Sequence, residues 1–125
     1  MAELFTVKGE RTMSQGFIAQ YAAEAARQTE GVADMDRSGV AGLKEALGLE
    51  HEGYGVTVQF KEEDHNLVTL TVYPIIYYGM VVPEVAWAIQ ENIKSDVEKY
   101  TGLVVEAVNV HVKNIVLRPE EVENA

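Results

Sequence analysis

The chain has 125 residues, of which 47% are hydrophobic and 24% are charged. This length and composition fit one globular domain with a hydrophobic core and argue against wholesale disorder. There is no cysteine, which excludes disulfides and thiolate metal sites and is typical of a reducing compartment. The formal net charge of −10 argues against binding to nucleic-acid phosphates or directly to an anionic lipid surface.

The N-terminal part begins with two weak extended stretches, Leu4–Val7 and Glu10–Met13. A helix is expected next, over residues 14–29, because Ser14 is a suitable N-cap and Gly31 a natural stop. Apolar residues recur in it at helical spacing and predict one buried stripe: Phe17, Ile18, Tyr21, Ala22 and Ala25.

Residues 31–55 are rich in glycine. Val40, Leu43 and Leu47 have the spacing of a short amphipathic helix, but Gly42 in its interior costs about 1 kcal/mol. We therefore expect a mobile excursion from the core that contains a short helical piece.

The pattern then changes to the alternation typical of strands. Val56, Val58 and Phe60 alternate with polar residues, a polar turn follows over residues 62–66, and a second strand is expected over residues 67–78. Pro74 has no N–H to donate to a ladder, so this strand must lie at an edge, carry a bulge or end there.

No charged residue occurs from Asn66 to Pro83. A transmembrane helix needs about 20 consecutive apolar residues. This run is shorter and is interrupted by Thr69, Thr71 and Pro74, which favours a strand over a membrane span. The N-terminus lacks the basic-then-apolar order of a signal peptide, so we expect a cytoplasmic protein.

A long amphipathic helix is predicted to begin at Pro83 and to end before Gly102. Glu84 stands in its first turn, where a carboxylate is favourable against the helix dipole. The expected buried stripe is Val85, Ala86, Ile89, Ile93, Val97 and Tyr100.

A last strand is expected over residues 103–112. The valines change parity near Glu106 and Ala107, which predicts a bulge. These elements predict a single α+β domain over residues 1–117 and an acidic flexible tail over residues 118–125.

The order β-α-(short α)-β-β-α-β predicts a two-layer sandwich, with a three- to four-stranded mixed sheet covered by two main helices. The strands on either side of the long helix should be parallel. The arrangement is ferredoxin-like if the N-terminal stretch pairs in the sheet, and a three-stranded variant if it does not.

The second half of the chain resembles the alkaline shock protein family, also called envelope stress response proteins. The matching blocks are Tyr78–Gly79, Pro83–Ala86, Gln90–Lys94, Thr101–Leu103 and Val108–Val112. The first half matches more loosely, and the similarity covers about residues 9–115. The resemblance implies a role in bacterial envelope stress or, in some members, lipid metabolism, without an agreed enzymatic activity.

This chain departs from the family pattern in two places. Ile76 and Tyr77 precede Tyr78 where relatives often carry a charge, and Glu50 and Glu52 flank His51 in a segment that is often basic. The second departure weakens any inference of an anionic partner at that segment.

No catalytic or metal-binding motif is present, and we expect no cofactor. The three histidines lack the spacing of a zinc site, and the cluster at His51 is more typical of a solvated loop. The remaining enzymatic alternative uses His111, Asn109 and Asn92. The polar centre of the family block, Gln90, Glu91 and Asn92, has two competing interpretations: structural hydrogen bonds or ligand contacts.

Trp87 indicates a function more clearly than the polar residues of the family block do. It falls about 135° from the buried stripe of its helix, counting 100° per residue, so it is expected to be exposed. The alternative is that Trp87 packs against the glycine-rich segment 38–48. The apolar residues nearby predict a partner-binding surface: Tyr73, Ile75, Tyr77, Met80, Val82 and Trp87.

We therefore expect a non-catalytic protein that self-associates or binds a membrane-anchored partner during envelope stress. The alternative is a regulator that binds an enzyme of lipid synthesis. Some RNA-binding modules share the α-β-β-α-β order, but we do not expect nucleic-acid binding, because the chain has no basic stripe.

Overall fold

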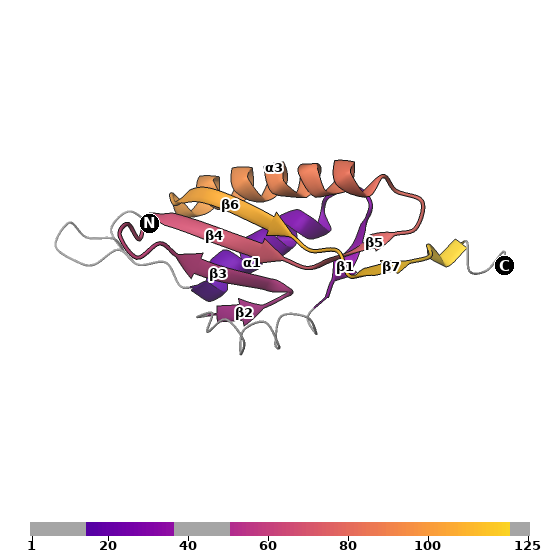
Figure 1. Ribbon diagram of the computed structural model, residues 1–125, viewed down its shortest axis with the longest axis horizontal. Coiled ribbons are helices and arrows are strands. Elements are labelled where there is room, and N and C mark those ends of the chain that lie inside the picture. Colours follow the sequence, from indigo (N-terminus) through magenta and orange to yellow (C-terminus); the bar gives the residue numbers. More distant parts are fainter. Residues whose placement is uncertain (1–14, 37–50, 121–125) are drawn as a thin grey trace.

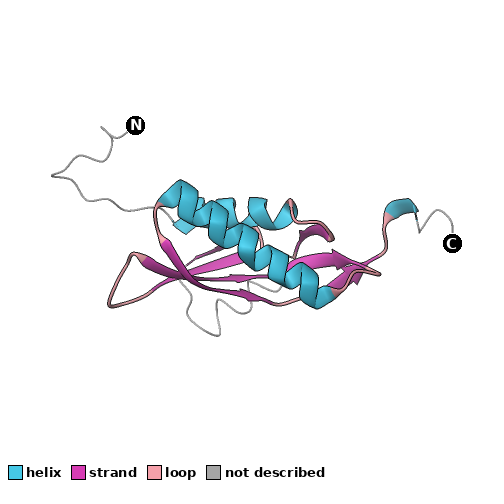
Figure 2. Ribbon diagram, turned by 90° about the horizontal axis from the view of Figure 1, so that it is seen from above, coloured by secondary structure: helices cyan, strands magenta, loops and turns pink. Residues whose placement is uncertain are grey.

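A computed structural model describes residues 15–36 and 51–120 of the chain. Two long helices lie on the same side of the strands, as Figures 1 and 2 show. The elements in chain order are α1 (Gln15–Arg27), β1 (Val32–Met35), β2 (His51–Gly53), β3 (Val56–Phe60), β4 (Leu67–Val72), β5 (Pro74–Tyr77), α3 (Val82–Thr101), β6 (Val104–Val110) and β7 (Asn114–Val116).

The strands form two sheets. The four-stranded sheet has the order β2-β3-β4-β6, and the three-stranded sheet has the order β1-β5-β7. β6 pairs with β4 in parallel, as predicted, and β7 pairs with β5 in parallel, whereas the other pairs are antiparallel. Because β5 continues from β4 and β7 from β6, two chain segments run side by side from one sheet into the other (Figure 1).

The passage between the sheets lies at Tyr73. The backbone N–H of Tyr73 donates to the Gly55 carbonyl at 3.0 Å, while its carbonyl accepts from the N–H of Asp36 at 2.7 Å. Pro74 then opens β5 opposite Met35 of β1. The prediction that the strand ends or is irregular at Pro74 is therefore confirmed.

The bulge predicted in the last strand is also confirmed. Val68 pairs with Val105, but the next residue, Thr69, pairs with Ala107, so Glu106 is the extra residue. Beyond the bulge β6 continues with its valines half-buried at positions 108 and 110.

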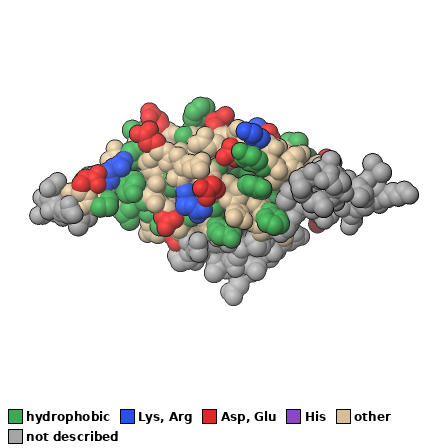
Figure 3. All heavy atoms as spheres, turned by 180° about the vertical axis from the view of Figure 1, so that it is seen from behind, with side chains coloured by type: hydrophobic (Ala, Val, Ile, Leu, Met, Phe, Trp, Pro, Cys, Tyr) green, Lys and Arg blue, Asp and Glu red, His purple; other side chains and the backbone are tan. Residues whose placement is uncertain are grey.

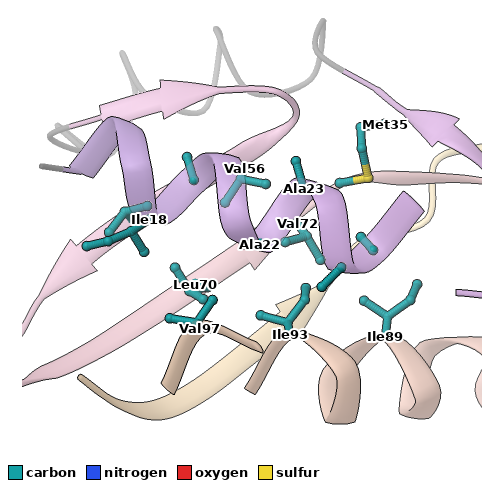
Figure 4. Close-up of a cluster of buried hydrophobic side chains, with 14 of the residues drawn as sticks. Ile18, Ala22, Ala23, Met35, Val56, Leu70, Val72, Ile89, Ile93 and Val97 are labelled. Atoms are coloured by element: carbon teal, nitrogen blue, oxygen red, sulfur yellow. The ribbon is translucent and has the colours of Figure 1, made fainter. Parts of the chain in front are cut away.

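The core lies between the helices and the sheets (Figure 4). Helix α3 contributes the predicted residues Val85, Ile89, Ile93 and Val97, and α1 contributes Ile18 together with a set of alanines. The fully buried large side chains of the strands are Val56, Val58, Val68, Leu70, Val72, Pro74 and Ile76.

The predicted stripe of α1 is wrong in part. Phe17 and Tyr21 are exposed, whereas Ala19, Ala23 and Ala26 are buried. Helix α1 contacts α3 on one side and β1 to β3 on another, and only small side chains fit between elements that approach closely from several directions. Tyr21 instead stacks on Tyr100, which is exposed at the far end of α3, with ring centroids 5.4 Å apart.

Several expectations have a different outcome. The N-terminal stretches and the short helix around Val40 lie outside the described residues. β1, β2 and β7 were not predicted, and the expected single strand over residues 67–78 is divided into two. The helix expected from Pro83 begins at Val82 and ends at Thr101, and Gly102 caps it in the left-handed conformation, as predicted.

Candidate interaction surface

The connection from β5 to α3 exposes apolar side chains. Gly79 turns the chain with a φ of +95°, and nothing lies within 4 Å of where a Cβ would stand. Val81 precedes the helix, and its carbonyl accepts the N–H groups of Glu84 and Val85 at 3.0 and 3.1 Å. The helix therefore starts on an apolar residue without a side-chain cap.

Three large apolar side chains stand out from this connection and the first turns of α3. The exposed fractions are 64% for Tyr78, 56% for Val81 and 64% for Trp87. The prediction that Trp87 is exposed is confirmed. The segment 38–48, against which the alternative would pack Trp87, lies outside the described residues. Trp87 lines a shallow depression together with Pro83, Glu84 and Ala88.

On the face of the molecule that carries the helices, hydrophobic side chains occur in separate groups among charged ones (Figure 3). We use the name Trp87 surface for the group formed by Tyr78, Val81 and Trp87.

The other apolar residues predicted for this surface are partly covered by the chain itself. Ile75, Tyr77, Met80 and Val82 are half-buried. Met80 packs over Gly31, where an added Cβ would come within 2.7 Å of its Cε. These residues border the Trp87 surface.

Arg118 covers part of the same region. Its guanidinium carbon lies 4.4 Å from the centre of the Tyr77 ring, and its Nη2 lies 3.5 Å from the Met80 Sδ. A cation over an aromatic ring is a favourable arrangement. The predicted domain boundary at residue 117 stays a prediction.

Tyr73 does not belong to an open surface, contrary to prediction. Only 3% of it is exposed, its ring stacks on His111 with centroids 5.5 Å apart, and the Lys113 Nζ lies 5.6 Å from its ring centre. Burial raises the pKa of the Tyr73 hydroxyl. The residue lies where the strand passes between the sheets, a position that side-chain alternation does not reveal.

The polar residues of the family block protect the edge of β6. Gln90 Nε2 donates to the Val108 carbonyl at 3.0 Å, and Lys94 Nζ donates to the Val105 carbonyl at 3.3 Å. Glu98 accepts from the Val105 N–H at 2.9 Å. An edge strand exposes unpaired backbone groups to foreign strands, and here one row of α3 side chains occupies them.

Glu98 holds the centre of this arrangement. The Lys94 ammonium, 2.7 Å from the Glu98 Oε2, and then the N–H of Val105 hold the pKa of the Glu98 carboxyl below its ordinary value of 4.5. The carboxylate thereby links two turns of α3 to the start of β6.

Asn92 has a structural bond as well. Its Nδ2 donates to the Thr29 hydroxyl at 2.9 Å, and that hydroxyl donates to the Ala25 carbonyl at 3.0 Å. Asn92 therefore ties α3 to the end of α1. For Asn92 this hydrogen bond supports a structural role rather than a ligand contact.

Asn109 and His111 are not brought together with Asn92. Asn109 Nδ2 lies 3.5 Å from the Thr71 hydroxyl, and His111 stacks on Tyr73. Thr71 alternates with the core residues Leu70 and Val72, so it lies on the sheet face turned away from the helices. The sheet thus separates these side chains from Asn92, and the enzymatic constellation is not assembled.

Two further observations concern the described parts of the chain. Residues 15–36 and 51–120 contain no group of three or more acidic or histidine side chains that could hold a metal ion. Within the same residues, no helix is long and apolar enough to cross a membrane.

The sequence matches the alkaline shock protein 23 family, described by its cell envelope-related function, over residues 3–117. It is 32% identical over 91 residues to the uncharacterized protein YqhY of Bacillus subtilis, covering 73% of this chain and 65% of YqhY, slightly less than two thirds of that protein. It is also 32% identical to YloU of Bacillus subtilis, covering 90% of this chain and 93% of YloU. The uncharacterized protein Spy1614 of Streptococcus pyogenes is 32% identical over 88% of this chain and 90% of its own length.

Among solved structures, a zinc form and a manganese form of MamM CTD variants are similar. They are 14% and 15% identical to this chain, each with a TM-score of 0.45. They cover 79% and 81% of this chain and 84% and 99% of their own. A likeness at this level supports no conclusion about function.

Proposed function

Because the chain belongs to the alkaline shock protein 23 family, whose function is related to the cell envelope, we propose that it acts by binding rather than by catalysis. It self-associates and binds a protein partner through the Trp87 surface during envelope stress. The observation that carries the proposal is that Tyr78, Val81 and Trp87, all in the connection from β5 into the first turns of α3, are exposed in a chain of net charge −10.

Exposed apolar residues are ordinary when they are single, but grouped aromatic residues are enriched at protein interfaces. Tryptophan and tyrosine are the side chains that most often dominate binding energy when an interface buries them. Close packing next to the surface favours the same role, because Met80 and Val85 pack over Gly31. Such a surface loses little entropy on binding.

The partner we propose is another copy of the chain, a membrane-anchored protein, or both. The protein is then cytoplasmic and becomes peripheral to the membrane through that partner. A strongly acidic chain is repelled by anionic lipid, so its membrane association requires a protein in between.

Light scattering at tens of micromolar protein tests the proposal. The unaltered chain is expected to have a mass above that of a monomer, and Trp87→Glu is expected to bring it to the monomer mass. Phe17→Glu is the matched control, because Phe17 is 56% exposed and lies near Tyr21 and Tyr100, at the other end of α3. A monomer that Trp87→Glu leaves unchanged contradicts self-association.

A pull-down from bacterial lysate with the unaltered chain and with Trp87→Glu distinguishes our proposal from the alternative, a regulator that binds an enzyme of lipid synthesis. Our proposal expects the chain itself or an envelope protein as the main prey, lost with Trp87→Glu. An enzyme of lipid synthesis as the main prey supports the regulatory alternative instead.

A further inference from the structure

A second exposed apolar group lies on β7 and the residue that follows it. Ile115 and Leu117 are 52% and 47% exposed, and β7 is the outer strand of the three-stranded sheet. Lys113 and Arg118 flank this group. We use the name basic patch for Lys113, Ile115, Leu117 and Arg118.

The charges of the basic patch are not neutralised within the described residues. Lys113 and Arg118 lie over the rings of Tyr73 and Tyr77, but neither has a carboxylate within ion-pair distance there. Their side chains are thus held in place by aromatic contacts while their positive charge stays available.

Acidic side chains of α3 stand beside Trp87. Glu84 and Glu91 stand three residues before and four residues after Trp87, which places all three on one face of α3. Both carboxylates are exposed, and neither pairs with a cation of the described chain. We use the name acidic patch for Glu84, Trp87 and Glu91.

Both patches lie at the same end of the molecule. The Tyr78 N–H donates to the Val116 carbonyl at 2.7 Å, so the connection that leads into α3 runs directly beside β7. Figure 1 shows the start of α3 and β7 at the end of the molecule opposite to the β3–β4 turn.

We propose that two copies associate about a two-fold axis, with the acidic patch of each copy on the basic patch of the other. The inference rests on the proposed self-association and specifies its interface. A two-fold interface requires that two surfaces of one chain be complementary and close together, so that both contacts form at once. These patches are complementary in charge, and each offers apolar side chains to bury.

A second copy fits better than the other occupants. A foreign basic segment matches only the acidic patch, and a foreign acidic segment matches only the basic patch. An anionic membrane attracts the basic patch but is repelled by the adjacent acidic patch. Only another copy of this chain neutralises both patches in one contact.

Charge reversal tests the inference by sedimentation equilibrium. The double variants Glu84→Lys/Glu91→Lys and Lys113→Glu/Arg118→Glu are each expected to weaken the dimer by about tenfold or more, because like charges then face each other. An equimolar mixture of the two is expected to restore association, since in the mixed dimer both contacts again join opposite charges. Combining all four substitutions in one chain should restore the homodimer.

Glu62→Lys/Glu63→Lys is the matched control for Glu84→Lys/Glu91→Lys, because it makes the same change in net charge in the exposed β3–β4 turn. Circular dichroism establishes that each variant is folded. If both charge-reversal variants dimerise as tightly as the control variant, the inference is overturned, while self-association stands. Loss of association that the mixture does not restore also overturns it, and a monomeric unaltered chain overturns both proposals.

Discussion

The strands β6 and β7 follow each other along the chain, and each lies at the edge of its sheet, but only the edge of β6 is covered. We call the β6 part of this outer edge the protected half and the β7 part the open half. Along β6, side chains of α3 bond to the edge backbone groups at Val105 and Val108. Along β7, the described structure has no such cover, and all three residues of the strand are exposed. An uncovered apolar edge is a place where another chain can dock.

The difference shows how one helix restricts where the protein can associate. The covering row on α3 begins at Gln90, and Trp87 precedes it on the same side of the helix. Before Gln90 the helix exposes the Trp87 indole and the Glu84 carboxylate, whereas Gln90, Lys94 and Glu98 bond to the backbone of β6. The family block therefore marks the border between an open end and a protected end of the molecule.

The largest effect is expected from Gly31→Ala, in the open half. Gly31 has a φ of +98°, and an added Cβ meets the Met80 Cε at 2.7 Å and the Val85 Cγ2 at 3.1 Å. The flexible end of Met80 can move aside, but the branched Val85 side chain is stiff, so backbone strain and overpacking against Val85 together should lower the free energy of unfolding by about 3 kcal/mol. Denaturant unfolding followed by circular dichroism measures the loss.

Gly79→Ala is the matched control, because Gly79 also has a positive φ but has nothing within 4 Å of an added Cβ. Strain alone predicts a loss of about 1 kcal/mol there. If the two variants lose the same stability, the packing of Met80 over Gly31 does not support the open half.

The sequence predicted the protected half better than the open half. The strand at Val56, the helix from Pro83 and the bulge at Glu106 have local signals: alternation, helical period and a change of parity. β1 and β7 are too short to show a period, and they exist because each pairs with β5.

The candidate surface was predicted only in part, because some of its residues have a local signal in the sequence and others do not. Trp87 was identified because its position on the helix follows from counting residues. Tyr73 was placed on the surface because its strand was treated as one straight element, whereas the chain passes between sheets there and buries the ring. Arg118 was missed because it lay in the predicted tail, and no local signal places a guanidinium over Tyr77.

A smaller effect is expected from Glu98→Gln, in the protected half. At neutral pH the substitution removes the charge that pairs with Lys94 and should lower the free energy of unfolding by about 1 kcal/mol, since the pair is partly exposed. Folding lowers the pKa of Glu98, so the stabilisation is present above 4.5 and is lost as the pH falls through the folded-state pKa. Unfolding curves from neutral to acidic pH should therefore converge for the two proteins.

Glu91→Gln is the control for this pH series, because Glu91 is exposed and forms no ion pair with the described residues. A stability gap for Glu98→Gln that persists in acid, or that is no larger than for Glu91→Gln, contradicts the role of Glu98 in holding α3 on the edge of β6.

The smallest effect on stability is expected from Ile115→Thr. Ile115 pairs with Ile76 across the parallel strands β5 and β7, yet Ile76 is fully buried while Ile115 is 52% exposed at the edge. Ile115→Thr should therefore change the free energy of unfolding by less than about 0.5 kcal/mol, whereas Ile76→Ala should cost about 3 kcal/mol. If the edge is an interface, Ile115→Thr should nevertheless weaken self-association in light scattering, because only association buries that side chain. A large loss of stability with Ile115→Thr would mean that the chain itself covers β7, and then the two halves of the outer strand would not differ.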